Sequence, residues 1–260
     1  MLSAAERLRA EIEKSLSRRD IHTEVYACLS STNDHARAGA LSGAAANTLV
    51  AACRQTAGRG RQGRSFFSPE GGVYMSLLLR PERLDNPERI TVAAAVAVAC
   101  AVEKISGKEA KIKWVNDVLV DGKKVSGILT EGGMTADGKA WAVLGIGVNL
   151  SAPEGGFPEE LCGIAGAVFS ESTIKQRGAL IAAIAECFLE LYENGDDDVL
   201  YSAYCARDFL KGKKVYITLN NAETEAEALG IDRDFSLRVR LPDGKTISLH
   251  SGEARARRKL

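Results

Sequence analysis

The chain has 260 residues, enough for one or two domains, and its 34 Lys and Arg residues balance its 34 Asp and Glu residues. With 45% hydrophobic and 26% charged residues, it has the composition of a globular protein, which excludes disordered and low-complexity classes. A protein that mainly binds nucleic acid or anionic lipid would carry a basic excess. Any strongly charged function must therefore be local.

No apolar segment approaches the roughly 18 residues that a membrane span needs. The N-terminal segment is charged throughout, unlike a signal peptide or an anchor. The six cysteines are scattered in apolar segments without a C-x-x-C pair. We therefore expect reduced thiols in a cytoplasmic protein that does not contact membranes.

The first 150 residues are predicted to mix helices with strands. Ser3 and Glu6 form a capping box that starts an amphipathic helix, and the polar cluster Ser30–Asp34 is predicted to cap a second helix. The Ala- and Val-rich residues 88–105 are predicted as a buried helix. Predicted strands cover residues 23–29, 48–53, 74–79, 111–115, 118–120, 125–130 and 141–148, with hairpin turns at 121–122 and 137–138.

The later residues change from helices to short strands. Helical periodicity runs from Ser172 to Asn194, with Gly195 as the expected cap, and another helix is predicted over about residues 199–210. After Lys211, strands predicted at residues 215–219, 223–231, 236–241 and 246–250 suggest a small barrel. We therefore predict an α+β fold with domains at residues 1–210 and 211–260.

Residues 54–64, called the arginine loop below, contain four arginines, three glycines and no acidic residue. Residues 58–63 satisfy G-x-G-x-x-G, but no helix is predicted after them, which argues against a dinucleotide-binding βαβ unit. Arginine offers forked donors that match carboxylate and phosphate oxygens. We interpret the segment as an anion-binding loop that orders on its ligand. A mobile surface loop and an RNA-binding Arg/Gly segment are the alternatives.

Polar residues also gather at the ends of neighbouring predicted strands. Asn116 and Asp117 follow one strand, Lys124 begins another, and Asn149 ends a glycine-rich strand. Taken singly, these residues are typical of turns and exposed hairpin tips. Together, an ammonium, a carboxylate and an amide are the groups needed to hold a nucleotide phosphate, its metal ion and a second anion.

The segment Ser31-Thr32-Asn33 is first of all a helix cap, but a cap can also present hydroxyls and a helix N-terminus to a polar ligand. The chain has no Walker A sequence and no nucleophile elbow. Its three histidines are isolated from one another, which argues against metal binding by imidazole.

Five motifs occur in a characteristic order. They are Ser31-Thr32-Asn33; Gln55 followed by Gly58-Arg59-Gly60-Arg61, Gly63 and Arg64; Lys113-Trp114-x-Asn116-Asp117; Lys124-x-x-Gly127-Ile128-Leu129; and Gly145-Ile146-Gly147-x-Asn149. In this order they resemble the biotin protein ligase family. The resemblance implies a class II synthetase-like catalytic domain with a mixed, mostly antiparallel sheet and flanking helices, followed by an SH3-like β-barrel.

Two departures from the family pattern affect what we expect. Val115 stands where the family usually has proline, so the strand itself is expected to keep Trp114 extended. The winged-helix DNA-binding domain that precedes the catalytic domain in bifunctional members is missing from the sequence. We therefore expect no DNA partner.

The resemblance implies ATP-dependent attachment of biotin to a specific lysine through biotinyl-5′-AMP. The acceptor would be the biotin carboxyl carrier protein of acetyl-CoA carboxylase or of another biotin-dependent carboxylase. The protein would then be a ligase that forms a C–N bond, acts as a monomer or homodimer, and uses biotin, ATP and Mg²⁺. A lipoate ligase or octanoyl transferase, which shares the catalytic fold, is the alternative enzyme, and an adaptor without activity is the alternative class.

The resemblance also implies roles for individual residues. Lys124 and Arg61 would be catalytic, because positive charge must offset the repulsion between a carboxylate and a triphosphate. Asp117 would be the candidate contact for Mg²⁺. Biotin would be bound by Ser31, Thr32, Asn33, Gln55, Arg59, Gly60, Arg61 and Lys124. ATP and the adenylate would contact Arg59, Arg61, Asn116, Asp117, Lys124 and Asn149.

Overall fold

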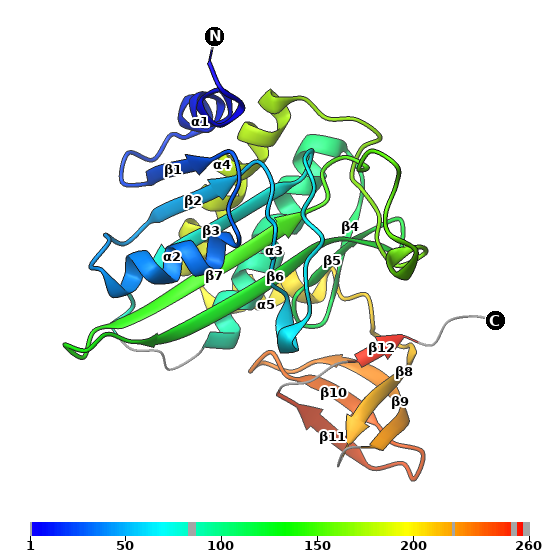
Figure 1. Ribbon diagram of the computed structural model, residues 1–260. Helices are drawn as coiled ribbons and strands as arrows, with labels where there is room; N and C mark the ends of the chain where they lie inside the picture. Colours follow the sequence, from blue (N-terminus) through cyan, green and yellow to red (C-terminus); the bar gives the residue numbers. More distant parts are fainter. Residues whose placement is uncertain (1, 83–86, 220–221, 251–253, 257–260) are drawn as a thin grey trace.

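The computed structural model describes residues 2–82, 87–219, 222–250 and 254–256. Its larger part is a seven-stranded mixed sheet between two layers (Figure 1). Only β1 and β2 pair in parallel, and the other neighbours are antiparallel. In spatial order the strands are β1 (His22–Tyr26), β2 (Thr48–Ala52), β3 (Val73–Leu79), β7 (Ala140–Val148), β6 (Lys123–Met134), β5 (Asp117–Val120) and β4 (Ala110–Lys113).

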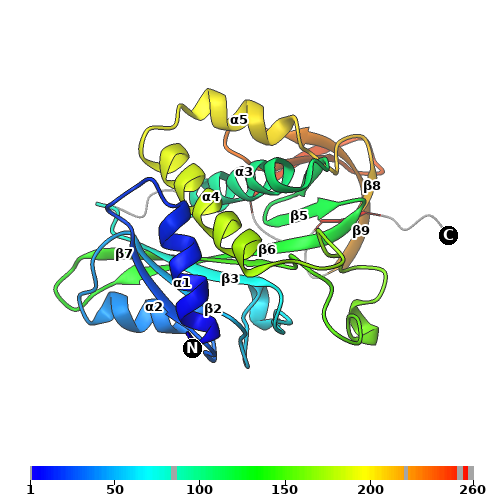
Figure 2. The same ribbon diagram turned by 90° about the horizontal axis from the view of Figure 1, so that it is seen from above.

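The helices lie on both faces of this sheet (Figure 2). One face is covered by α3 (Pro87–Ser106) and α4 (Ile174–Glu193), with α5 (Asp197–Cys205) packed on α3. The amphipathic helix α1 (Ala4–Ser15) packs against α4 and buries Leu8 and Ile12. The opposite face carries α2 (Thr32–Leu41) and the arginine loop, and is called the α2 face below.

The core is centred on α3, whose small side chains allow close packing against the sheet. A nearly continuous run of its alanines and valines is buried, including Val92, Ala95 and Ala99. Phe188 of α4 is also completely buried. No helix in the described part of the chain is both long and apolar enough to cross a membrane.

A second, antiparallel sheet follows the helices and lies beneath the larger one in Figure 1. We call it the C-terminal sheet. Within the described residues its ladder runs from β11 to β12, without a pairing that closes a barrel. In spatial order its strands are β11 (Thr246–Leu249), β10 (Leu237–Arg240), β9 (Ala222–Ile231), β8 (Lys214–Leu219) and β12 (Ala254–Ala256).

Four local features differ from what the sequence predicts. Helix α5 ends at Cys205 instead of near Leu210, because the next residues pair with β4 through hydrogen bonds from Ile112 N to Arg207 O and from Phe209 N to Ile112 O. Strand β1 is shorter than predicted, and β12 was not predicted. Gly195 does not adopt the left-handed conformation of a helix cap. A Cβ there would collide with Leu191 O, so close approach explains this glycine.

Candidate functional site

Small residues in three neighbouring strands leave room on the α2 face of the sheet for side chains from other segments. Ser76 of β3 pairs with Gly145 of β7, and Gly147 of β7 pairs with Gly127 of β6. Directly opposed residues of antiparallel strands project to the same face. The three glycines therefore share the α2 face, and we call them the glycine floor. Phe66 lies on this floor, since a Cβ at Gly147 or Gly127 would meet its ring.

The N-terminus of α2 borders the glycine floor. Ser31 caps the helix by accepting a hydrogen bond from the backbone N of Asp34. The backbone N and the hydroxyl of Thr32 lie 2.8 and 3.1 Å from Gln55 Oε1. Gln55 in turn donates to Ser68 Oγ over 2.9 Å. These bonds fix the start of α2 against the start of the arginine loop.

Asn33 connects α2 to the sheet beneath it. Its side chain is buried, with Oδ1 2.7 Å from Ser76 Oγ and Nδ2 2.9 Å from Glu131 Oε2. A Cβ on Gly145 would collide with the Asn33 amide, so this glycine makes room for the contact. Ser31, Thr32 and Asn33, which are predicted to bind biotin, are thus brought together in one hydrogen-bonded group.

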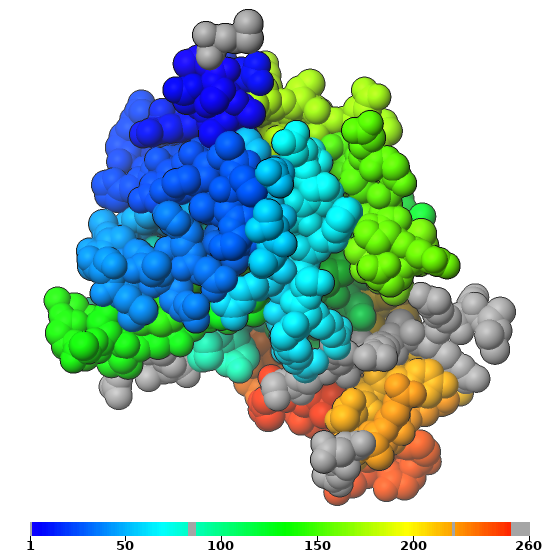
Figure 3. Space-filling view, viewed as in Figure 1, coloured from blue at the N-terminus to red at the C-terminus, as the bar shows by residue number. Residues whose placement is uncertain are grey.

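The arginine loop folds back on itself beside α2. Gly60 N donates to Arg64 O over 2.7 Å, and Phe66 N donates to Gly58 O over 2.8 Å. Gln62, at the tip, has a left-handed φ of 56°. Figure 3 shows the loop in cyan between α2 and the light-green segment after β7. Gly60 thus contributes backbone to a folded turn.

Two carboxylates from different elements hold Arg59. Its guanidinium lies 2.6 Å from Asp34 Oδ1 on α2 and 2.9 Å from Glu131 Oε1 on β6. Burial opposes a charged guanidinium, but the bond to Asp34 and the nearby Glu131 raise the pKa of Arg59. The arginine loop is therefore tied to both sides of the α2 face, and the charge of Arg59 is locally balanced.

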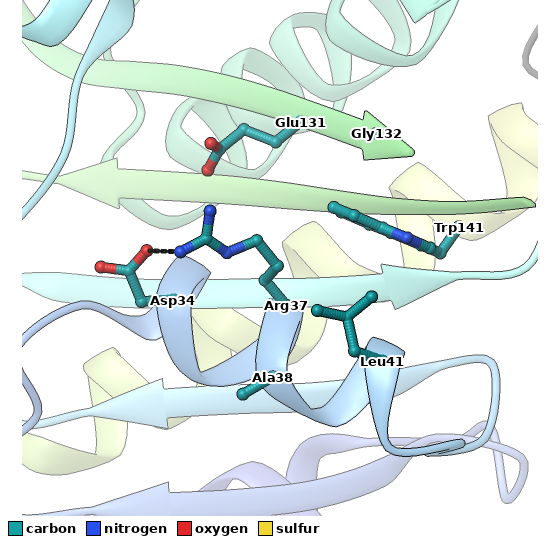
Figure 4. Close-up of a pocket in the computed structure, with 7 residues that line it drawn as sticks. All are labelled: Asp34, Arg37, Ala38, Leu41, Glu131, Gly132 and Trp141. Carbon is teal, nitrogen blue, oxygen red and sulfur yellow. Dashed lines mark hydrogen bonds and ion pairs between the residues drawn. The ribbon is translucent and has the colours of Figure 1, made fainter. Parts of the chain in front are cut away.

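A pocket of about 530 Å³ opens next to these ion pairs. In Figure 4, Asp34 on α2 and Glu131 on β6 approach it from opposite sides. Its remaining lining residues are Arg37, Ala38, Leu41, Gly132 and Trp141. The pocket shares the two carboxylates with Arg59 but lies away from Lys124, so it borders the predicted site without containing it.

The second group of predicted residues meets at the other end of β6. Arg61 Nη1 donates to Asn116 Oδ1 over 3.0 Å, and Asn116 Nδ2 donates to Ile128 O over 2.9 Å. Lys124 Nζ lies 2.6 Å from Asp117 Oδ1. The structure thus gathers two cations, one carboxylate and one amide from three separate segments.

Asn149 is the predicted residue that stands apart from this second group. Its side-chain amide donates to Gly166 O over 3.1 Å, and Gly166 N donates to Lys124 O over 2.9 Å. Asn149 therefore holds the segment after β7 beside Lys124. The side-chain hydrogen bond of Asn149 is thus made to backbone and is structural.

Several residues of the site were missed by reasoning from the sequence. Ser76 could have been noticed as the polar residue of an otherwise apolar strand, and Glu131 as the acid that follows the Gly-Ile-Leu motif. Asp34 was counted only as a capping residue. Phe66 carried no signal, because its importance depends on glycines in two distant strands.

One carboxylate in the second group could contact a metal ion. Mg²⁺ is commonly held by one or two carboxylates together with substrate phosphates. Asp117 fits that pattern, with a side chain only 18% exposed. Among the residues that the structure describes, no group of three or more His, Cys, Asp or Glu side chains could hold a metal ion by itself.

Known proteins resemble this chain in sequence and in fold. Residues 25–149 match the family described as "Biotin/lipoate A/B protein ligase family". The chain is 41% identical to the bifunctional ligase/repressor BirA of Bacillus subtilis over 176 residues, which are 66% of this chain and 54% of that protein. It is 34% identical to a biotin--[acetyl-CoA-carboxylase] ligase of Paracoccus denitrificans over 217 residues, 79% of this chain and 89% of that protein.

The structural comparison covers more of the chain. The biotin protein ligase of Aquifex aeolicus, solved in complex with biotin and ATP, matches with a TM-score of 0.75 and 26% identity. The match covers 92% of this chain and 99% of that one, so it includes both sheets. By contrast, the chain spans about half the length of the bifunctional ligase/repressor BirA from Bacillus subtilis, 54%, and from Bacillus spizizenii, 52%.

Proposed function

The chain belongs to the biotin protein ligase family, and from that premise we propose that it joins biotin to a lysine of a carrier protein in two steps. The observation that carries the proposal is the gathering of Arg61, Asn116, Asp117 and Lys124 beside Gly127 of the glycine floor, with the hydrogen-bonded start of α2 beside Gly145 of the same floor. Such an arrangement suits a ligand with a polar head at one end and an anionic group at the other.

In the first step, a carboxylate oxygen of biotin would attack the α-phosphorus of ATP. An O–P bond forms, the bond to pyrophosphate breaks, and biotinyl-5′-AMP results. Lys124 and Arg61 would hold the two negatively charged reactants together, because fixed cations lower the repulsion between them. Mg²⁺, with Asp117 as its protein contact, would neutralise phosphate charge when bound.

In the second step, the ε-amine of the acceptor lysine would attack the acyl carbon. A C–N bond forms, the C–O bond to AMP breaks, and the amine loses a proton. The arginine loop would lie over the adenylate and limit its exposure to water, which would otherwise hydrolyse it. Ser31, Thr32, Asn33 and Gln55 would bind the biotin head by hydrogen bonds.

The carrier of a biotin-dependent carboxylase is the acceptor that we propose, in line with the name of the Paracoccus relative. The test incubates the protein with biotin, MgATP and an isolated biotin-acceptor domain, followed by intact-mass spectrometry. We expect the acceptor to gain the mass of one biotinyl group, and a variant without its target lysine to gain none. No mass gain with biotin, or a gain with lipoate or octanoate in parallel incubations, would overturn the proposed substrate.

A further inference from the structure

The indole of Trp114 reaches from the large sheet to the C-terminal sheet. Strand β4 ends at Lys113, so the expectation that a strand holds Trp114 is wrong. Its side chain is buried, and Nε1 donates to the backbone carbonyl of Phe235 over 2.9 Å. The two residues are 121 positions apart, and Phe235 lies in the turn between β9 and β10.

A tyrosine of α5 contacts the residue after Trp114, in the turn that connects β4 to β5. Tyr204 is fully buried and donates its hydroxyl to Val115 O over 3.2 Å. Burial raises the pKa of Tyr204 well above its ordinary value, so the phenol keeps its proton. The rings of Tyr204 and Phe235 meet edge to face, with centroids 6.4 Å apart. We call Trp114, Tyr204 and Phe235 the aromatic clamp.

The aromatic clamp holds the backbone at residues 114–115, immediately before the polar residues of the site. Asn116 and Asp117 follow Val115 directly, and their side chains bind Arg61 and Lys124. The hydrogen bonds of Trp114 and Tyr204 go to backbone carbonyls and not to these polar side chains. The clamp can therefore affect their position but would not touch a ligand that they bind. Displacement of reacting groups by about 1 Å can cost on the order of 100-fold in rate.

We propose that Trp114 and Tyr204 are positioning residues, through which the C-terminal sheet and α5 hold the turn at residues 114–117 in place for the nucleotide. The inference rests on the proposed function, because it assigns the turn to the adenylation step. It gives the C-terminal sheet a role in catalysis without direct contact between that sheet and the substrate. It also gives a reason for the tryptophan two residues before the Asn-Asp pair, because its indole N–H is the donor that reaches Phe235 O.

The matched variants are Trp114→Phe and Tyr204→Phe, which remove one hydrogen-bond donor each while keeping an aromatic ring. Tyr201→Phe is the control. Tyr201 also lies on α5 and donates to the C-terminal sheet, at Ile231 O over 2.9 Å. Its ring lies near Phe235, with centroids 6.4 Å apart, but its hydroxyl bonds to Ile231 and not to the turn at residues 114–117. A purely structural role would make all three variants alike, whereas a positioning role separates the first two from the third.

The readout is the initial rate of biotinyl-5′-AMP formation at varied ATP and at varied biotin, with thermal unfolding measured on each variant. We expect kcat/KM for ATP to fall roughly 10-fold in Trp114→Phe and in Tyr204→Phe, as for loss of a buried hydrogen bond. The affinity for biotin alone and the kinetics of Tyr201→Phe should remain those of the unmodified protein.

The inference is overturned if Trp114→Phe and Tyr204→Phe lower the melting temperature but keep kcat/KM for ATP, as Tyr201→Phe is expected to do. If one of the two variants does not fold, the other decides the question by the same criterion. Failure of the proposed function would look different, since the unmodified protein would then form no adenylate. In that case ATP affinity, measured by calorimetry on the same variants, tests whether the clamp positions the turn.

Discussion

Replacing Lys124 by glutamine removes the ammonium that lies nearest to Asp117. Its Nζ is 2.6 Å from the carboxylate, and both side chains are mostly shielded, at 31% and 18% exposed. A hydrogen bond between charged groups contributes about 1.5–3 kcal/mol. If Lys124 makes such a bond to the reacting anions, its loss should slow adenylate formation roughly 10- to 150-fold.

Lys123→Gln is the matched control, because it removes the same charge from the exposed neighbouring residue on the same strand. Single-turnover mixing of each variant with biotin and MgATP, followed by quantification of biotinyl-5′-AMP, measures the effect. We expect Lys123→Gln to keep the rate of the unmodified protein. The reasoning would be refuted by a folded Lys124→Gln variant with the same rate, or by equal losses in both variants.

Two further changes test the contacts of the α2 face. Glu131→Gln should release one of the two carboxylates that hold Arg59, and amide exchange at residues 58–64 of the ligand-free protein should quicken by roughly two- to fivefold; unchanged exchange would show that the ion pair does not restrain the loop. Gly147→Ala should lower the free energy of unfolding by about 1–3 kcal/mol in a urea titration, because its Cβ would overlap the Phe66 ring. A stability equal to that of the unmodified protein would mean that this ring does not rest on the glycine floor.

Much of the fold could be predicted because local patterns and tertiary packing agree. The polar run before α2 predicts a helix start, and Ser31 is the N-cap. The Ala- and Val-rich segment predicts a buried helix, and α3 is buried along most of its length. Prediction failed where pairing partners are remote, as after Cys205, whose following residues extend along β4 instead of continuing the helix.

The site was predictable in its residues but not in its pairings. Arg59 and Arg61 were both expected to present positive charge, yet Arg59 is balanced by Asp34 and Glu131, whereas Arg61 binds the amide oxygen of Asn116. Those partners lie on other elements, and their distance in the sequence leaves no local pattern. The sequence motif also marks Trp114 without indicating that its indole binds the C-terminal sheet.

Adenylation is the first step of the proposed reaction, and it can be measured without any acceptor. The protein is incubated with biotin and MgATP alone, and the mixture is analysed by mass spectrometry for biotinyl-5′-AMP and pyrophosphate. Both products should appear, with the adenylate retained by the protein. Folded protein that binds biotin and ATP but forms neither product would contradict the proposed adenylation.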